Sequence, residues 1–381
     1  MKIAINGMFW NQPTTGSGQY VRALVAALRE CAPQNEYVVI PPVPGGGRQE
    51  AGGGRQEAGG RRRSAVENIS KVWFEQIAFV RACRRARADV AHVPYFGSPL
   101  VSLTPTVVTI HDLIPLVLPA YRGSLLVRAY TALAAQSARR AATIIADSEH
   151  SRRDIITHLR IDAARVRVVY LAADAHYRPL DDATRIEALR RKLGLPENYL
   201  LYLGGYDQRK NVRVILDAFA RAELYRAGYR LVLAGVNLGR DSEFFPDPRR
   251  LAREVNLPAD ALCLLGWVEE EDKVALYAGA RAFLFPSRYE GFGLPPLEAM
   301  ASGTPVLCAH ASSLPEVVGD AAILLPPDDA RAWADALCAL LADAARRAEL
   351  RARGLAQARK FSWARCAEET LAVYENVRRE T

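Results

Sequence analysis

Short apolar runs alternate along almost the whole chain with longer stretches whose apolar positions recur every three or four residues. This alternation predicts parallel sheets covered by helices. In the first half we predict strands at Lys2–Asn6, Tyr37–Ile40, Val90–Val93, Thr106–Ile110, Thr143–Ala146 and Arg167–Tyr170. In the second half we predict strands at Tyr199–Leu203, Arg230–Ala234, Leu262–Leu265, Ala282–Phe285, Pro305–Cys308 and Ala322–Leu325.

Two such sets of strands in 381 residues predict two Rossmann-like α/β domains, because this length exceeds that of a typical single domain. The stretch 172–182 contains Pro179 and the pair Asp181-Asp182 and is the predicted linker. We therefore place a first domain at residues 1–176 and a second at 177–361. A helical pattern fills residues 362–381.

A helix is also predicted for Val66 to Arg87. Its helically spaced apolar positions predict a face in the core; they are Val66, Ile69, Val72, Trp73, Ile77 and Val80. Before it, the heptapeptide at 45–51 is repeated at 52–58, and this glycine-rich segment predicts a loop after the second strand. The repeat is either a neutral tandem duplication or a part of acceptor binding.

The chain carries a formal net charge of +8, and its arginines crowd into the first half. Arg81, Arg84, Arg85 and Arg87 end the predicted helix, so we expect contact with an anionic membrane surface. The alternative is that these arginines simply form solvated helix faces. No recognised nucleic-acid motif accompanies them, and we expect no nucleic-acid partner.

No apolar run is long enough to span a membrane, and the start of the chain reads as a strand rather than a signal peptide. The six cysteines are scattered without metal-ligand spacing, and Cys263 and Cys308 lie in apolar strand-like runs that predict buried thiols. We therefore expect a cytoplasmic protein, with contact at the inner face of the cell membrane. The sequence also lacks D-x-D and H-E-x-x-H motifs, so we expect neither a metal ion nor another cofactor.

The segment from Ser287 to Met300 is the most informative about chemistry. It places Glu290 and Glu298 eight positions apart on a strand, glycine-rich loop and helix pattern, with Pro296 in the first helical turn. The loop Gly291-Phe292-Gly293-Leu294 offers backbone N–H groups at a helix N-terminus, where anions bind. Two carboxylates and a row of amides suit a polyhydroxylated, negatively charged ligand such as a nucleotide-sugar.

A second constellation follows the predicted strand Tyr199–Leu203. Gly205 lies in a turn that leads to Arg209 and Lys210 just before a helix. Cations are unfavourable at a helix N-terminus, so their presence predicts an anionic ligand there. Cations preorganised where charge develops on a leaving diphosphate are a strong catalytic device.

Further candidate residues lie where strands give way to loops or helices. His111 and Asp112 follow the strand Thr106–Ile110, and Asp112 either orients the histidine or caps the next turn. Gly16 and Gly18 open a helix expected from Tyr20, with Ser17 as the alternative N-cap. Val268 follows the strand Leu262–Leu265, and Ser148 is a predicted N-cap.

These motifs resemble glycosyltransferase family 4. The Glu-x7-Glu pattern of Glu290 and Glu298 and the wider match from Phe285 to Val306 carry the resemblance, which extends over nearly the whole chain. The resemblance implies a GT-B fold, in which two Rossmann-like domains have parallel sheets that face each other across a crevice. It also implies that the first domain binds the acceptor, that the second binds the donor, and that the terminal helix returns to the first.

The resemblance further implies retaining hexose transfer from a nucleotide-diphosphate sugar to a hydroxyl of a glycan or lipid-linked acceptor. His111, Arg209, Lys210 and Glu290 are then catalytic. The donor is held by Gly16, Gly18, Gly205, Val268, Gly291, Phe292, Gly293, Leu294 and Glu298. The His-Asp-Leu-Ile-Pro stretch resembles that of mannosyltransferases and favours GDP-mannose over UDP-glucose. A GT-B epimerase and a non-catalytic sugar-nucleotide binder are the alternatives.

Overall fold

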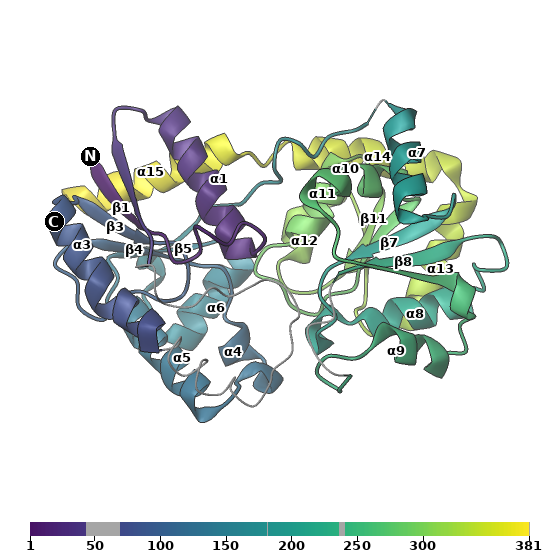
Figure 1. Cartoon of the computed structure of the whole chain (residues 1–381), viewed down its shortest axis with the longest axis horizontal. Coiled ribbons are helices and arrows are strands. Elements are labelled where there is room, and N and C mark those ends of the chain that lie inside the picture. Colours follow the sequence, from purple (N-terminus) through teal and green to yellow (C-terminus); the bar gives the residue numbers. More distant parts are fainter. Residues whose placement is uncertain (43–68, 181, 236–240, 381) are drawn as a thin grey trace. The chain divides into compact units, whose positions relative to one another are not determined.

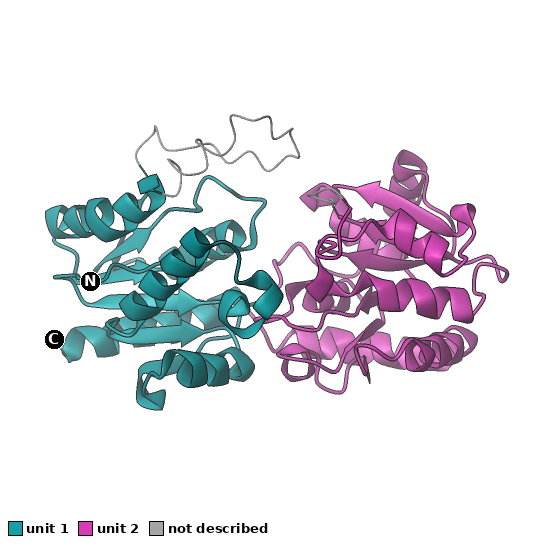
Figure 2. Cartoon of the chain, turned by 90° about the horizontal axis from the view of Figure 1, so that it is seen from below, with its two compact units in different colours: residues 1–171, 363–381 teal, residues 172–362 magenta. Residues whose placement is uncertain are grey.

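The computed structural model of the chain describes residues 1–42, 69–180, 182–235 and 241–380. They form two compact units, coloured separately in Figure 2. Unit 1 comprises Met1–Leu171 and Trp363–Thr381, and unit 2 comprises Ala172–Ser362. Unit 1 therefore ends at Leu171 rather than at residue 176, and the terminal helix belongs to it. The glycine-rich repeat at 45–58 lies outside the described residues.

Unit 1 contains a six-stranded parallel sheet in the order β2-β1-β3-β4-β5-β6. The strands are β1 (Lys2–Asn6), β2 (Glu36–Ile40), β3 (Val90–Val93), β4 (Thr106–Ile110), β5 (Thr143–Ala146) and β6 (Val166–Val168). All six strand predictions are confirmed, although β6 ends two residues before Tyr170. The order reverses between β1 and β3, so the topological switch point of this sheet lies between these two strands.

Helices cover both faces of the sheet of unit 1 (Figure 1). They are α1 (Gly16–Cys31), the π-helix η1 (Phe74–Ala78), α3 (Phe79–Ala86), α4 (Ile114–Val117), η2 (Pro119–Tyr121), α5 (Leu125–Ala138), α6 (Glu149–Leu159), η3 (Ala163–Arg165) and α15 (Trp363–Arg379). Helices α1 and α15 pack side by side on one face. The hydroxyl of Tyr374 on α15 lies 2.6 Å from Nδ1 of the buried His92 on β3.

Unit 2 contains a second six-stranded parallel sheet, in the order β12-β11-β10-β7-β8-β9. Its strands are β7 (Tyr199–Leu203), β8 (Arg230–Ala234), β9 (Leu262–Gly266), β10 (Ala282–Phe285), β11 (Val306–Ala309) and β12 (Ile323–Leu325). Each was predicted to within one residue at either end. The switch point of this sheet lies between the neighbouring strands β7 and β10.

The helices of unit 2 also cover both faces of its sheet, with α8, α9 and α13 on one side and α7, α10, α11 and α14 on the other (Figure 1). They are α7 (Ala183–Leu193), η4 (Gln208–Lys210), α8 (Val212–Arg221), α9 (Pro248–Glu254), η5 (Ala259–Ala261), α10 (Glu270–Gly279), α11 (Leu294–Ala301), α12 (Leu314–Val318), α13 (Ala330–Ala342) and α14 (Ala344–Ala358). None of the helices formed by the described residues is long and apolar enough to cross a membrane.

The helical segment that ends at Ala86 buries a different face from the predicted one. Ile69, Trp73 and Ile77 are exposed by 69%, 48% and 39%, whereas Phe74, Glu75, Phe79 and Cys83 are buried. The predicted core face was therefore wrong for these three residues, while Val72 and Val80 are half-buried and Val66 lies outside the described residues. The physical reason is the π-helix Phe74–Ala78, because its i→i+5 bonds lengthen one turn and shift the helical periodicity.

The cysteines of the chain are all free. Cys308 is buried as predicted, whereas Cys263 is only half-buried.

Candidate functional site

The loops that follow β7 and β10 bring three of the predicted catalytic residues together. Nη1 of Arg209 and Nζ of Lys210 lie 2.8 and 2.7 Å from Oε1 of Glu290. Both loops leave the carboxyl ends of neighbouring strands at the switch point of the sheet of unit 2. Ligands bind at such points in open α/β sheets, so the triad has the location and the charges of an anion site.

The triad is held rigidly by its own loops. Ser287 donates to Oε1 of Glu290 at 2.5 Å, and the backbone N–H of Glu290 donates to Ser312 at 2.9 Å. Arg209 also donates to the carbonyl of Tyr289 at 2.7 Å, while its own carbonyl accepts from the backbone N–H of Arg288. These bonds fix the carboxylate relative to both cations before any ligand arrives.

Electrostatics keep Glu290 ionised. Burial alone would raise the pKa of this carboxyl, but Lys210 and Arg209 outweigh burial, and the pKa is lowered from its ordinary value. The side chain of each member of the triad is only 12–14% exposed. Because water is largely excluded, the charges interact more strongly here than they would on an open surface.

Glu298, the second carboxylate of the motif, has different surroundings. It lies on α11, one turn from the start of that helix as predicted, and Oε2 accepts a hydrogen bond from Tyr277 at 2.9 Å. Burial raises the pKa of Glu298, and Lys273 on α10 only partly counteracts this. The two carboxylates therefore present different groups: Glu290 is an ionised triad member, and Glu298 is a tyrosine-bonded acceptor.

The remaining predicted donor residues of unit 2 lie on loops at strand ends. Gly291 and Phe292 connect Glu290 to α11, Gly293 precedes its first residue Leu294 with φ of 127°, and the ring of Phe292 packs on Phe361. Gly205 follows β7. The side chain of Val268 after β9 is buried, so its backbone is what it can present to a ligand.

In unit 1, His111 follows β4 as predicted and is paired with a residue that the sequence did not reveal. Nδ1 of His111 lies 2.7 Å from Oδ2 of Asp147, a buried residue that follows β5. Burial alone would lower the pKa of His111, but the Asp147 carboxylate outweighs it, and the pKa is raised. Asp112 instead caps the next turn, since its Oδ1 accepts from the backbone N–H of Ile114 at 3.1 Å.

Gly16 and Gly18 both lie in the first turn of α1, which starts at Gly16 rather than near Tyr20. The N-cap is Thr15, whose hydroxyl accepts from the backbone N–H of Gly18 at 3.1 Å, and not Ser17. A Cβ at position 18 would lie 1.9 Å from the carbonyl oxygen of Gln12, so only glycine fits beneath that loop. Ser148 caps α6 as predicted.

Sequence reasoning missed Asp147, Tyr277 and Ser287 as supporting residues. Ser287 had a local signal because it lies three positions before Glu290 in the same loop, and Asp147 had one because it directly follows a predicted strand. Asp147 and Tyr277 lie 36 and 21 positions from their partners and meet them through the fold.

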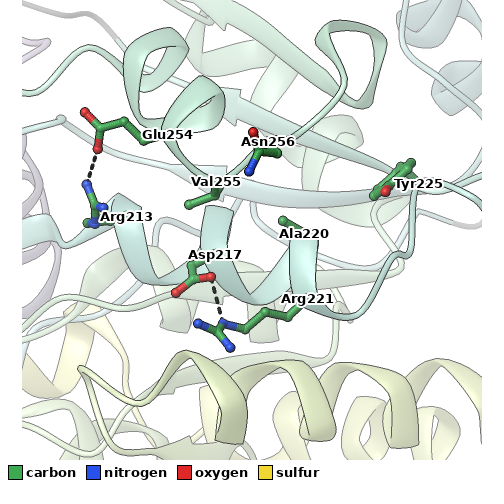
Figure 3. Close-up of a pocket in the computed structure, with 8 residues that line it drawn as sticks. All are labelled: Arg213, Asp217, Ala220, Arg221, Tyr225, Glu254, Val255 and Asn256. Atoms are coloured by element: carbon green, nitrogen blue, oxygen red, sulfur yellow. Dashed lines mark hydrogen bonds and ion pairs between the residues drawn. The ribbon is translucent and has the colours of Figure 1, made fainter.

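A surface hollow of about 490 Å³ on α8 and α9 contains no predicted site residue. Its charged side chains pair with one another, Arg213 with Glu254 and Arg221 with Asp217 (Figure 3). Within the described part of the chain, no group of three or more His, Cys, Asp or Glu side chains is arranged to hold a metal ion.

Comparisons with known proteins cover both units. The family model described as "Glycosyltransferase Family 4" matches residues 14–177, and the model "Glycosyl transferases group 1" matches residues 185–360. The O-antigen chain mannosyltransferase B of Escherichia coli is 36% identical over 77% of this chain and 76% of its own length. The serotype-specific mannosyltransferase WbdA of Escherichia coli is 35% identical over 69% of this chain, which spans only 32% of that longer protein.

Solved structures support the fold. A sucrose-phosphate synthase from Thermosynechococcus elongatus matches with a TM-score of 0.75 at 22% identity, over 100% of both chains. Anabaena HepE in complex with UDP-glucose matches with a TM-score of 0.75 at 18% identity, over 99% of this chain and 100% of its own. The predicted α/β class with two parallel sheets is thereby confirmed as the GT-B fold. Both family models and the mannosyltransferase relatives indicate the same family. The chain therefore belongs to glycosyltransferase family 4 and is a glycosyltransferase.

Proposed function

We propose that this enzyme transfers a hexose from a nucleotide-diphosphate sugar to a hydroxyl of a glycan or lipid-linked acceptor, with retention of configuration. The observation that carries the proposal is the Arg209–Lys210–Glu290 triad at the switch point of unit 2. The mannosyltransferase names of the relatives support GDP-mannose as the donor, with UDP-glucose as the alternative. The family assignment supports a transferase over the epimerase and the non-catalytic binder.

In this proposal Arg209 and Lys210 bind the diphosphate of the donor. The bond between the anomeric carbon and the phosphate oxygen breaks, and the two cations stabilise the negative charge that develops on the diphosphate. The acceptor hydroxyl attacks from the side that the diphosphate leaves, and the departing phosphate oxygen takes its proton. Front-face attack gives retention without a covalent intermediate. The two cations supply the charge that a divalent metal would otherwise provide.

The other predicted residues have supporting roles in the proposal. Glu290 accepts hydrogen bonds from hexose hydroxyls and Glu298 from the ribose, while the backbone of Val268 contacts the base. The amides of Gly291, Phe292, Gly293 and Leu294 at the start of α11 hold oxygens of the donor, as do Gly205, Gly16 and Gly18. His111, held by Asp147, donates to a sugar hydroxyl near the reacting carbon.

We also place the reaction in the cytoplasm, at the inner face of an anionic membrane. Arg81, Arg84, Arg85 and Arg87 are exposed at the end of the helical segment whose earlier turns expose Ile69, Trp73 and Ile77. An exposed aromatic and aliphatic row beside a basic cluster fits the interface of anionic lipids.

A donor screen tests the proposal. The purified enzyme is incubated with GDP-mannose, UDP-glucose and related donors plus methyl α-D-mannoside, and the released nucleoside diphosphate is measured. We expect GDP release from GDP-mannose with formation of an α-linked product, as observed by NMR of the anomeric proton. A β-linked product would overturn retention, faster turnover of UDP-glucose would overturn the donor, and conversion of the donor into its epimer would overturn transfer itself.

A further inference from the structure

Unit 1 has a switch point of its own, and none of the predicted catalytic residues lies there. It lies between β1 and β3, whereas His111 and Asp147 follow β4 and β5. Asn6 is the last residue of β1, and Tyr95 comes two positions after β3 ends. Because open α/β sheets bind ligands at this location, the side chains gathered around Asn6 and Tyr95 are candidates for a binding site.

These side chains form a buried polar cluster around Glu75, which is 0% exposed. Tyr130 donates to Oε1 of Glu75 at 2.9 Å, and Tyr95 contacts both Glu75 and Oδ1 of Asn6, the latter at 3.4 Å. Among the described residues, Oε2 of Glu75 and Nδ2 of Asn6 have no hydrogen-bond partner. Buried polar atoms without partners are rare and destabilising, so their presence at a ligand-binding edge calls for a function.

Lys71 connects this cluster to the surface. Its Nζ lies 3.9 Å from Oε1 of Glu75, and its side chain is 31% exposed. The same Nζ lies 4.6 Å from the ring centre of Tyr130 and 5.6 and 5.8 Å from those of Tyr95 and Phe9. Phe9 and Tyr130 are only half-buried, so an ammonium and two aromatic rings are presented together.

The backbone supports the same interpretation. Glu75 lies in the π-helix Phe74–Ala78, and π-helical turns are rare and occur frequently at functional sites. The turn directs Glu75 inward while Trp73 and Ile77 remain exposed. Because the pair lies in a poorly hydrated setting, burial raises the pKa of Glu75 to about 7 and lowers that of Lys71.

We propose that Lys71, Phe9 and Tyr130 form a subsite for the acceptor sugar on unit 1, with Glu75 as the residue that positions Lys71. The rings supply apolar surface for the C–H face of a pyranose, and the ammonium donates to one of its hydroxyls. His111 is linked to this cluster through the chain, since its Nε2 lies 3.3 Å from the carbonyl oxygen of Pro94, and the next residue, Tyr95, has its ring centre 5.6 Å from Nζ of Lys71. This inference rests on the proposed function, since it needs a sugar acceptor.

Kinetics with separate titration of donor and acceptor test the subsite. The variants are Lys71→Met and the nearly isosteric Glu75→Gln, with Arg29→Met on the exposed end of α1 as the matched control. With GDP-mannose as donor and methyl α-D-mannoside or a mannobiose as acceptor, we expect the acceptor KM to rise about tenfold in both variants. The donor KM and the Kd for GDP should stay within about twofold of wild type, because unit 2 is untouched.

Direct measurement of sugar binding tests the subsite without depending on enzyme turnover. Ligand-observed NMR should show methyl α-D-mannoside bound to the wild type and to Arg29→Met, and weaker binding to Lys71→Met and Glu75→Gln. Lowered Tm values with unchanged sugar affinity and acceptor KM would overturn the subsite and leave the cluster structural. Absence of sugar binding to the wild type, or tighter Lys71-dependent binding of inorganic phosphate, would also overturn it. Failure of the proposed function is distinguishable, because GDP-mannose would then not turn over while sugar binding still depended on Lys71.

Discussion

The sheets of the two units have six parallel strands each, but different side chains gather at their switch points. In unit 2 that point holds Arg209, Lys210 and Glu290, joined by ion pairs of 2.7 and 2.8 Å. In unit 1 it holds aromatic rings around Lys71 and Glu75, whose closest charged atoms are 3.9 Å apart. Dense charge suits a diphosphate that gains charge during the reaction, whereas rings with one ammonium suit a neutral sugar. The same edge of the same kind of sheet thus carries two different sets of side chains, according to the loops and helices that surround it.

The largest effect should follow from removing either cation of unit 2. Arg209→Ala or Lys210→Ala should lower kcat/KM by about a hundredfold or more, roughly 3 kcal/mol of transition-state stabilisation. Each variant should also bind free nucleoside diphosphate more weakly, as measured by calorimetry. Arg221→Ala removes an exposed arginine of α8 and is the control. Near-normal turnover in both single variants would contradict the proposed difference between the two switch points, because the cations of unit 2 would then not contribute to the reaction.

The two carboxylates of the motif sharpen the comparison within unit 2. Glu290→Gln should lower kcat by about tenfold or more, because contacts to the hexose strengthen as the ring becomes oxocarbenium-like. Glu298→Gln should mainly raise the donor KM, because ribose contacts stabilise the ground state and transition state equally. Steady-state kinetics on both variants separates the roles. The opposite pattern, with KM changed by Glu290→Gln and kcat by Glu298→Gln, would reverse the assignment.

Asp147 provides a test on the side of unit 1. Asp147→Asn should lower the pKa of His111, which an NMR titration of the imidazole reports. Since the pKa in the folded protein is raised above the ordinary 6.5, the stabilisation is fully present below that value and is lost as the pH rises through the raised one. The variant should therefore lose about 2 kcal/mol of unfolding free energy near pH 5.5 and clearly less near pH 8.5. An equal loss at both pH values would show that the pair does not stabilise the imidazolium.

The basic cluster at Arg81, Arg84, Arg85 and Arg87 of unit 1 should bind anionic lipid, and the surface of unit 2 should not. Arg84→Gln should weaken binding to vesicles that contain phosphatidylglycerol by about 1 kcal/mol at low salt. The matched control is Arg331→Gln, an exposed arginine on α13 of unit 2. Flotation of both variants and the wild type reports the difference. Equal flotation of the wild type with neutral and anionic vesicles would remove membrane contact from the proposed function.

The smallest expected effect is that of removing metal ions. If Arg209 and Lys210 replace a divalent cation, EDTA should leave kcat/KM within about twofold of its value with added Mg²⁺. The released nucleotide is measured in both conditions. A loss of turnover in EDTA that Mg²⁺ restores would show that the cations of unit 2 do not suffice.

The sequence predicted the strands and pointed to Arg209, Lys210 and Glu290 as candidate site residues because all of them have local signals, whereas the ion pairs among the three appear only in the structure. Each strand is an apolar run of its own, and Arg209, Lys210 and Glu290 directly follow two of these runs. Asp147 also directly follows an apolar run, but its pairing with His111 depends on the pairing of β4 with β5, which a single sequence does not show. The face of the helical segment at 69–86 was wrong because the π-helical turn breaks the 3.6-residue period that pattern reading assumes. Glu75 was missed for the same reason.

Because α15 packs on unit 1, the last part of the chain to be synthesised completes the unit that was begun first. All six strands of unit 2 are synthesised by Leu325, and its last helix ends at Ala358. The strands of unit 1 are synthesised first, but its helix α15 is complete only when residues 363–379 have been made. Until then unit 1 lacks the helix that packs on α1 and whose Tyr374 forms a hydrogen bond with His92. On the ribosome, unit 2 can therefore reach its complete packing before unit 1 does, which reverses the usual order in which domains of a growing chain fold.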